Sequence, residues 1–232
     1  MEVTVERVPR YISAAKIILS VAGPAQKLVQ KPGLTHIMCN RQAHIILFKD
    51  GYNEFAAIVD EFSLYLDKGV SWADEGFKNM AHFFNPRTSK GLYGWTDAAK
   101  ECSLYWNKAV RTWQQHNFEK AFFHLGAAVH LVQDMCVPHH AMGILLDGHQ
   151  DYEDWAEENR DNYRVDEQGI YDLGVQPADW LKANAKVAAK HYHLVREYAG
   201  EQNYHKATQV LLPRAQRVTA GFLHYFLTKM GI

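Results

Sequence analysis

The sequence contains few cysteines and no long apolar run. Cys39, Cys102 and Cys136 lie far apart and form no Cys-x-x-Cys pair, so neither a thiolate zinc site nor a disulfide framework is indicated, and at most one bridge could form. No apolar stretch reaches the roughly 18 residues that a membrane-spanning helix requires. These two absences exclude a small disulfide-rich domain and a transmembrane span.

A basic surface and the common catalytic motifs are also lacking. The 25 Lys and Arg residues are scattered and the formal net charge is −1, so no basic stripe is available to bind a run of phosphates. The sequence has no Gly-x-Ser-x-Gly elbow, no Gly-x-x-x-x-Gly-Lys loop, no His-Glu-x-x-His motif and no Glu-x-x-His motif. Nucleic acid is therefore not the expected partner, and a side-chain nucleophile is not indicated.

The composition is that of an ordinary globular protein. Hydrophobic residues make up 47% and charged residues 22% of the 232 residues, and no repeat or linker interrupts the chain after Gly33. We therefore predict one domain over residues 33–232, preceded by an N-terminal extension over residues 1–32.

Helical periodicity dominates this domain. Phe118, Phe122, Leu125 and Val129 recur at steps of three and four residues, whereas alternating strand patterns are nearly absent. The predicted fold class is all-α, a single multi-helix domain in which Pro213 kinks or divides the last helix. Residues 67–95 are predicted to form a long structured loop. The predicted helices cover residues 36–49, 52–66, 96–115, 118–135, 149–163, 177–198 and 203–229.

Two pairs of histidine and carboxylate residues indicate metal binding. His130 and Asp134 lie four residues apart on one face of a predicted helix, so both side chains can meet one ion. Their neighbours are apolar, and burying an unpaired carboxylate there would be costly. His149 and Glu153 repeat the spacing, and His140 lies between the pairs. One such pair alone is more often a surface ion pair, but two pairs so close together favour a metal centre.

The same segment carries a family resemblance. Phe122–His140, followed by His149-x-x-x-Glu153, resembles the signature of the bacterial zinc-dependent phospholipases C, whose wider superfamily includes the P1-type nucleases. Leu34–Arg41 and Ala215–Gly221 are similar to two further segments of these phospholipases. The resemblance covers roughly residues 33–232 and implies an all-helical domain with a trinuclear zinc site at one end.

Eight metal ligands are implied by this resemblance. They are His82, His130 and Asp134, with Asp74 bound or adjacent, for the first zinc; His140, His149 and Glu153 for the second; and His36 with the bridging Asp134 for the third. The third zinc of the family is also bound by the amino and carbonyl groups of an N-terminal Trp, whereas this sequence has no Trp before Trp72. We expect three zinc ions, or two if the N-terminal ligand is missing.

Asp74 is the predicted catalytic residue. As a general base or an orienting group it would act on the attacking water. The adjacent Glu75 is the alternative, but the Trp72-Ala73-Asp74 context and the shorter side chain favour Asp74.

Other histidines and aromatic residues have simpler interpretations. We predict that His139 is exposed, because adjacent imidazoles point in different directions and His140 matches the family pattern. His44 has apolar neighbours and is expected to be partly buried. The aromatic residues at helical spacing are expected to be core: Trp106, Trp113, Trp155, Tyr225 and Phe226.

The predicted reaction is hydrolysis of a glycerophospholipid on the glycerol side, which releases diacylglycerol and a phosphorylated head group. The enzyme is expected to be a monomer that touches the membrane surface transiently. The head group is open, because Glu75 and Asn79 replace a Tyr and a Phe of the choline-preferring family members. The alternatives are a single-strand nuclease of the P1 type and a non-catalytic helical zinc protein.

The N-terminus has two interpretations. Arg7 and Arg10 precede the apolar residues 11–22 and the small-residue segment Gly23–Ala25, which is the order of an export signal; an amphipathic helix of a cytoplasmic protein is the alternative. Cleavage after Ala25 would leave a new amino terminus ten residues before His36, close to the separation in the family. We predict export with removal of roughly 25 residues.

Overall fold

The chain folds into helices throughout the part that the structure describes. The computed structural model describes residues 33–92 and 96–232; the predicted export signal lies outside them. Within these ranges the only strand pairing is an isolated bridge between Asn85 and Lys90, which confirms the all-α class. The elements are α2 (Leu34–Lys49), α3 (Asn53–Glu61), α4 (Ser63–Ala73), η1 (Gly76–Ala81), α5 (Ala98–Gln114), α6 (Phe118–Asp134), α7 (Pro138–Met142), α8 (His149–Asn159), η3 (Arg160–Tyr163), α9 (Pro177–Ala188), η4 (Ala189–Leu194) and α10 (Glu201–Lys229).

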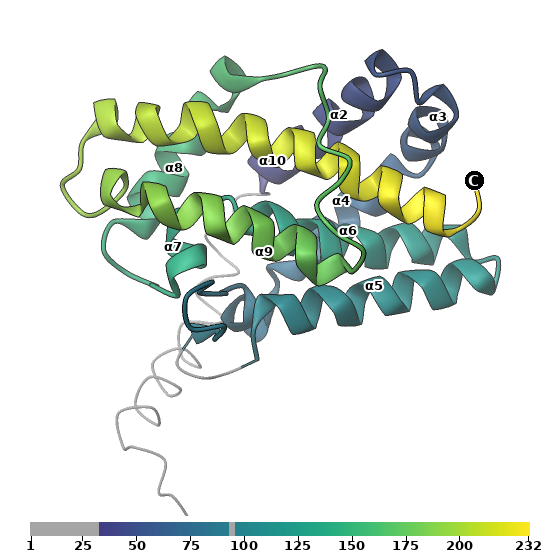
Figure 1. The fold of residues 1–232 in the computed structure, drawn as a ribbon, viewed down its shortest axis with the longest axis horizontal. Helices are drawn as coiled ribbons and strands as arrows, with labels where there is room; N and C mark the ends of the chain where they lie inside the picture. Colours follow the sequence, from purple (N-terminus) through teal and green to yellow (C-terminus); the bar gives the residue numbers. More distant parts are fainter. Residues whose placement is uncertain (1–32, 93–95) are drawn as a thin grey trace, which may run out of the picture.

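Helix α6 is the central element of the core. It packs against α4, α5, α9 and α10, and every residue from Leu125 to Asp134 is buried. Figure 1 shows α10 and α9 crossing the front of the molecule, with α5 along the lower edge and α7 and α8 at the left end. A helix that is buried on all sides must be apolar all round. His130, Gln133 and Asp134 depart from that rule at the C-terminal end of α6.

Two glycines let α4 and α6 touch backbone to backbone. A Cβ atom added at Gly69 would lie 1.9 Å from the carbonyl oxygen of Phe123, and one added at Gly126 would lie 2.1 Å from that of Leu66. Only glycine permits so close an approach. The contact brings the C-terminal end of α4, which is followed by Asp74, against the last turns of α6.

The predicted loop over residues 67–95 begins too early, because α4 continues to Ala73. The predicted helix over residues 52–66 is in fact broken at Phe62, which ends α3 and precedes α4. Phe62 stacks on Phe122 with ring centroids 4.9 Å apart, so tertiary packing places the break there. The rest of the loop contains η1 and the Asn85–Lys90 bridge.

The structure also shows how two prolines fit the helices, and it contradicts the predicted division of the last helix at Pro213. Helix α10 is not divided at Pro213 but runs on to Lys229. Proline has no N–H, so Pro213 cannot donate the helical hydrogen bond to the carbonyl oxygen of Gln209. Gln209 is exposed, and its carbonyl oxygen can bind water instead. Pro138 lies just beyond the end of α6 and begins the short helix α7. Proline is favoured at this first helical position, because the N–H that it lacks would have no hydrogen-bond partner within the helix.

Two further sequence-based expectations concern the cysteines and the membrane. All three cysteines are buried and unbridged. No helix in the described ranges is both long and apolar enough to cross a bilayer.

Candidate metal centre

The ends of several helices meet at one pocket, and all eight predicted ligands lie there. His36 belongs to the first turn of α2, Asp74 follows α4, and His82 follows η1. His130 and Asp134 lie in the last turns of α6, His140 lies in α7, and α8 contributes His149 and Glu153. Seven of the eight residues line a pocket of about 930 Å³, and the eighth, His130, is buried behind them.

The first group has the spacing of ligand atoms around one metal ion. His82 Nδ1, His130 Nε2 and Asp134 Oδ2 form a triangle with sides of 3.0, 3.1 and 3.2 Å. Asp74 Oδ1 lies 3.2 Å from His130 Nε2 and 3.6 Å from His82 Nδ1. Ligand atoms of a tetrahedral zinc site with bonds of about 2.0–2.1 Å are separated by roughly 3.3–3.4 Å. These four side chains therefore match one zinc ion in both atom type and spacing.

An unpartnered polar atom supports this fit. Asp134 Oδ2 is buried and makes no hydrogen bond, although the two imidazole nitrogens lie only 3.0 and 3.1 Å away. A buried carboxylate oxygen without a partner costs free energy. A cation between the three atoms would remove that cost.

The second group lies beside the first. Glu153 Oε1 is 3.1 Å from His140 Nε2 and 3.0 Å from His149 Nε2. The other ring nitrogen of His140 donates a hydrogen bond to the carbonyl oxygen of His82, at 2.9 Å. That bond fixes the ring with Nε2 directed towards Glu153, which is how carbonyl groups orient metal-binding imidazoles.

His36 faces the opposite oxygen of the same carboxylate. Its Nε2 lies 3.4 Å from Asp134 Oδ1, while Oδ2 faces His82 and His130. His36 Nδ1 donates to Gln133 Oε1 at 2.7 Å, so Nε2 is the nitrogen with a lone pair. Asp134 thus presents one oxygen to each of two groups, which is the geometry of a bridging ligand.

Helix ends and carboxylates make the pocket attractive to cations. The C-terminal ends of α4 and α6, where carbonyl groups carry partial negative charge, both point into the site. Burial raises the pKa of Asp134, but His130 and His140 outweigh it and hold the pKa well below its usual range. Burial likewise raises the pKa of Asp74, and His130 and His82 together outweigh it and lower the pKa below its usual value. Both carboxylates are therefore ionised at neutral pH.

The structure contradicts the prediction that His139 is exposed. Its side chain is fully buried, its Nε2 donates to the carbonyl oxygen of Asp147 at 3.0 Å, and its ring stacks on His149 with centroids 4.8 Å apart. The two imidazoles do point in different directions, as expected, but α7 turns both of them inwards. His139 therefore packs against the ring of His149 and helps to hold it in place.

The remaining expectations agree with the described residues. Glu75 is exposed, whereas Asp74 faces the two histidines. His44 is half-buried. The five aromatic side chains expected in the core all belong to it or pack against it: Trp106, Trp113, Trp155, Tyr225 and Phe226.

Sequence reasoning missed Gln133. Besides accepting from His36, it donates to Asn40 Oδ1 and to Thr219 Oγ1, both at 3.0 Å. A Gln next to a proposed bridging Asp, on a helix that is otherwise apolar, was the available signal. The three bonds hold the amide rigidly and thereby orient the imidazole of His36.

Replacing Gln133 by Leu is expected to weaken metal binding at the His36 site by roughly tenfold to a hundredfold, the usual cost of losing such a supporting bond. The two ligand groups that contain His82 and His140 should keep their metal ions. Zinc titration of the purified variant measures this. Gln42→Leu is the matched control, because Gln42 is equally buried on α2 but bonds only to Val165 O, away from the pocket. Equal metal loss in both variants would contradict the assigned role of Gln133.

Comparison with known proteins identifies the family. The family model described as zinc dependent phospholipase C matches residues 35–209. The chain belongs to the zinc-dependent phospholipase C family. The predicted family and enzyme class, a phosphodiester hydrolase of this type, are thereby confirmed.

Individual relatives agree with this membership. A phospholipase C of Listeria monocytogenes is 28% identical over 225 residues, which cover 84% of this chain and 77% of that protein. One of Bacillus cereus is 26% identical over 206 residues, covering 75% and 73%. The alpha toxin of Clostridium absonum has the same fold, with a TM-score of 0.77 at 23% identity, over 88% of this chain and 66% of the toxin. The chain thus spans about two thirds of that toxin's length.

Proposed function

We propose that this zinc-dependent phospholipase C hydrolyses the bond between glycerol and phosphate in glycerophospholipids and releases diacylglycerol and a phosphorylated head group. The observation that carries the proposal is the convergence of His36, Asp74, His82, His130, Asp134, His140, His149 and Glu153 on one pocket of about 930 Å³. A pocket of this size suits a small ligand or head group. The bridging geometry of Asp134 supports two metal ions close together, an arrangement that stabilises both the attacking and the leaving oxygen in phosphodiester hydrolysis.

Zinc bound in such a site lowers the pKa of a coordinated water towards about 7 and stabilises negative charge on phosphoryl oxygens. The two aspartates of the site would then have different roles. Both carboxylates line the pocket, but the side chain of Asp134 is 4% exposed and both its oxygens face imidazole nitrogens, whereas the side chain of Asp74 is 39% exposed. Asp74 is therefore the carboxylate that would orient the attacking water and accept its proton at Oδ2, because Oδ1 faces the imidazole nitrogens of the first group.

Two of the three proposed zinc ions each have three or more candidate side-chain ligands. The third has only His36 and Asp134. The remaining ligand of the third ion is proposed to come from the processed amino terminus, which lies outside the described residues. Export of the chain is part of this proposal, as is action as a monomer at a membrane surface.

The purified protein is expected to release phosphorylated head group from phospholipid in micelles and to show much lower turnover on single-stranded DNA. Analysis of the water-soluble and lipid products distinguishes the possibilities. A preference for DNA would favour the nuclease alternative, and release of phosphatidic acid would show that a different bond is cleaved. Elemental analysis should find two or more zinc ions per chain, and chelation followed by zinc should abolish and restore turnover. Zinc without turnover on any phosphodiester would favour the non-catalytic alternative.

A further inference from the structure

The two most exposed large hydrophobic side chains of the described residues lie on neighbouring loops. Tyr198 is 93% exposed and Leu146 is 76% exposed. Leu146 belongs to the loop between α7 and α8, and Tyr198 to the segment between η4 and α10. We call these two residues the docking patch.

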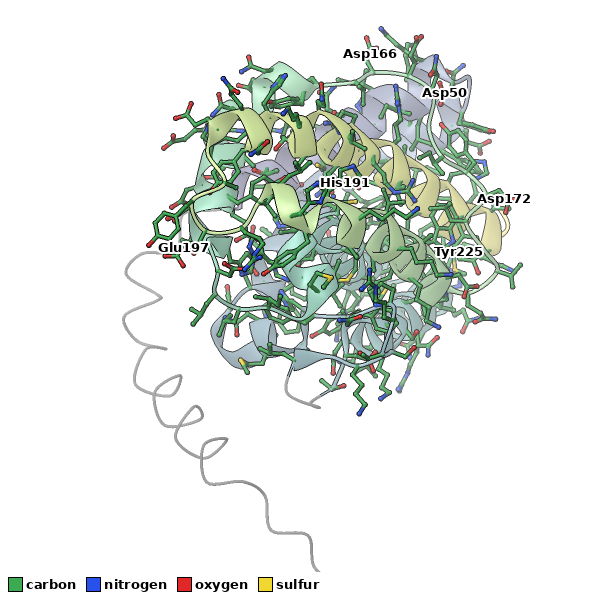
Figure 2. All side chains as sticks on the ribbon, turned by 60° about the vertical axis from the view of Figure 1, so that its left-hand side comes forward. Asp50, Asp166, Asp172, His191, Glu197 and Tyr225 are labelled. Atoms are coloured by element: carbon green, nitrogen blue, oxygen red, sulfur yellow. The ribbon has the colours of Figure 1, made fainter. Side chains whose placement is uncertain are left out.

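Asp147 ties the two loops together. Its carboxylate accepts hydrogen bonds from the Tyr192 hydroxyl, from Arg196 Nε at 2.9 Å and from the Glu197 backbone N–H at 3.4 Å. A Cβ atom added at Gly148 would lie 2.7 Å from the Glu197 nitrogen, so the backbones are in contact. Figure 2 shows Glu197 at the outer edge of the molecule. Leu146 and Tyr198 therefore project from one bonded unit.

The backbone is strained at Tyr198 and at Asp147, the residue after Leu146. Tyr198 and Asp147 adopt left-handed conformations, with φ of 65° and 66°, which residues other than glycine rarely adopt. Such strain persists only where the surroundings impose it, and it concentrates at functional sites. A bulky Tyr in this conformation, with its ring almost entirely in water, points to a role for the exposed ring.

The patch adjoins the pocket through the loop that carries Leu146. Leu145, the residue before Leu146, lines the pocket and packs against the cluster of Met80, Phe83 and Leu92. His149, a proposed ligand, follows three residues after Leu146. The loop that carries Leu146 therefore forms part of the pocket wall on both sides of that residue.

We propose that Leu146 and Tyr198 dock the protein on the surface of aggregated phospholipid, next to the pocket mouth. The inference rests on the proposed function, because a phospholipid substrate is held in a micelle or bilayer. Leu enters the acyl boundary, and Tyr suits the interface because its ring is apolar and its hydroxyl polar. Arg196 beside the patch is neutralised by Asp147, so the contact depends on apolar burial rather than on lipid charge.

The test compares two double variants, Leu146→Asn with Tyr198→Asn and the control Phe48→Asn with Val175→Asn. Asn tolerates the left-handed conformation of position 198. Phe48 and Val175 are 61% and 73% exposed, and neither lines the pocket. Turnover is measured on equimolar vesicles of dioleoyl phosphatidylcholine and dioleoyl phosphatidylethanolamine, and on the two dihexanoyl lipids below their critical micelle concentrations.

The docking variant is expected to lose roughly tenfold or more of its turnover on vesicles but less than about twofold on dissolved lipid, because only the vesicle contact needs the apolar side chains. The control should match the unaltered protein on both. Unchanged vesicle turnover in the docking variant would overturn the inference, as would equal losses on both substrates or an equal loss in the control. An unaltered protein that hydrolyses neither lipid form would instead overturn the proposed function.

Discussion

Replacing Asp134 by Asn is expected to lower turnover by roughly a hundredfold or more and to remove at least one zinc ion per chain. Even the mutation of a residue that only supports a metal ligand lowers metal affinity or activity by about 10–100-fold. One oxygen of Asp134 faces His36 and the other faces His82 and His130. Asn keeps the volume but has no negative charge, and it offers one carbonyl oxygen where the carboxylate offers two. The substitution therefore affects two ions together. Metal content by elemental analysis and turnover on micellar phospholipid are the measurements.

Asp50→Asn is the matched control for this variant. Asp50 accepts hydrogen bonds from Tyr171 and from the backbone of Gln168 and Gly169. It does not line the pocket, and Figure 2 shows it at the upper right of the molecule, across from Glu197. The control should lose stability but keep its zinc. Near-normal zinc and turnover in Asp134→Asn would show that this carboxylate does not bridge metal ions.

The long periodic helices were predictable because their periodicity reflects burial on one shared core. The predicted helix over residues 118–135 matches α6 at Phe118–Asp134, and that over residues 96–115 matches α5 at Ala98–Gln114. The break at Phe62 was not predictable, because it depends on contact with Phe122, which is distant in the sequence. Helix α7 was missed because its five residues are too few to show a period.

The candidate ligand residues, which the structure brings to one pocket, could be proposed from their spacing and from the family resemblance, whereas their surroundings could not. His130 and Asp134 share a helix face, so the sequence alone brings them together. The contact of Asp74 with His130 depends on the close approach at Gly69 and Gly126, two glycines that carry no recognisable signal in the sequence. Gln133 and His139 act through bonds to groups that only the fold places beside them. Supporting residues of this kind are therefore the part of a metal site that needs a structure.

The adjacent histidines of α7 should fail in different ways. His140→Ala removes the nitrogen that faces Glu153, so we expect one zinc ion fewer per chain and a loss of turnover of roughly a hundredfold or more. The metal-free variant should also lose stability, because the carbonyl oxygen of His82 loses the hydrogen bond from His140 Nδ1, so the zinc content is the readout that identifies the ligand. Elemental analysis and thermal unfolding of the metal-free variant separate the two effects.

His139→Ala should instead lower the free energy of unfolding by about 2–4 kcal/mol, because it leaves a cavity and an unpaired carbonyl. Burial lowers the pKa of His139 to about 4, so the ring is neutral at pH 7 and donates to Asp147 O through Nε2. Zinc content at saturating metal should stay near normal, since no ligand atom is removed. His139→Gln, which carries an N–H at the corresponding distance along the side chain, should recover part of the stability. If His139→Ala loses zinc while His140→Ala keeps it, then the ligand is the first histidine of the pair and the metal assignment at α7 is wrong.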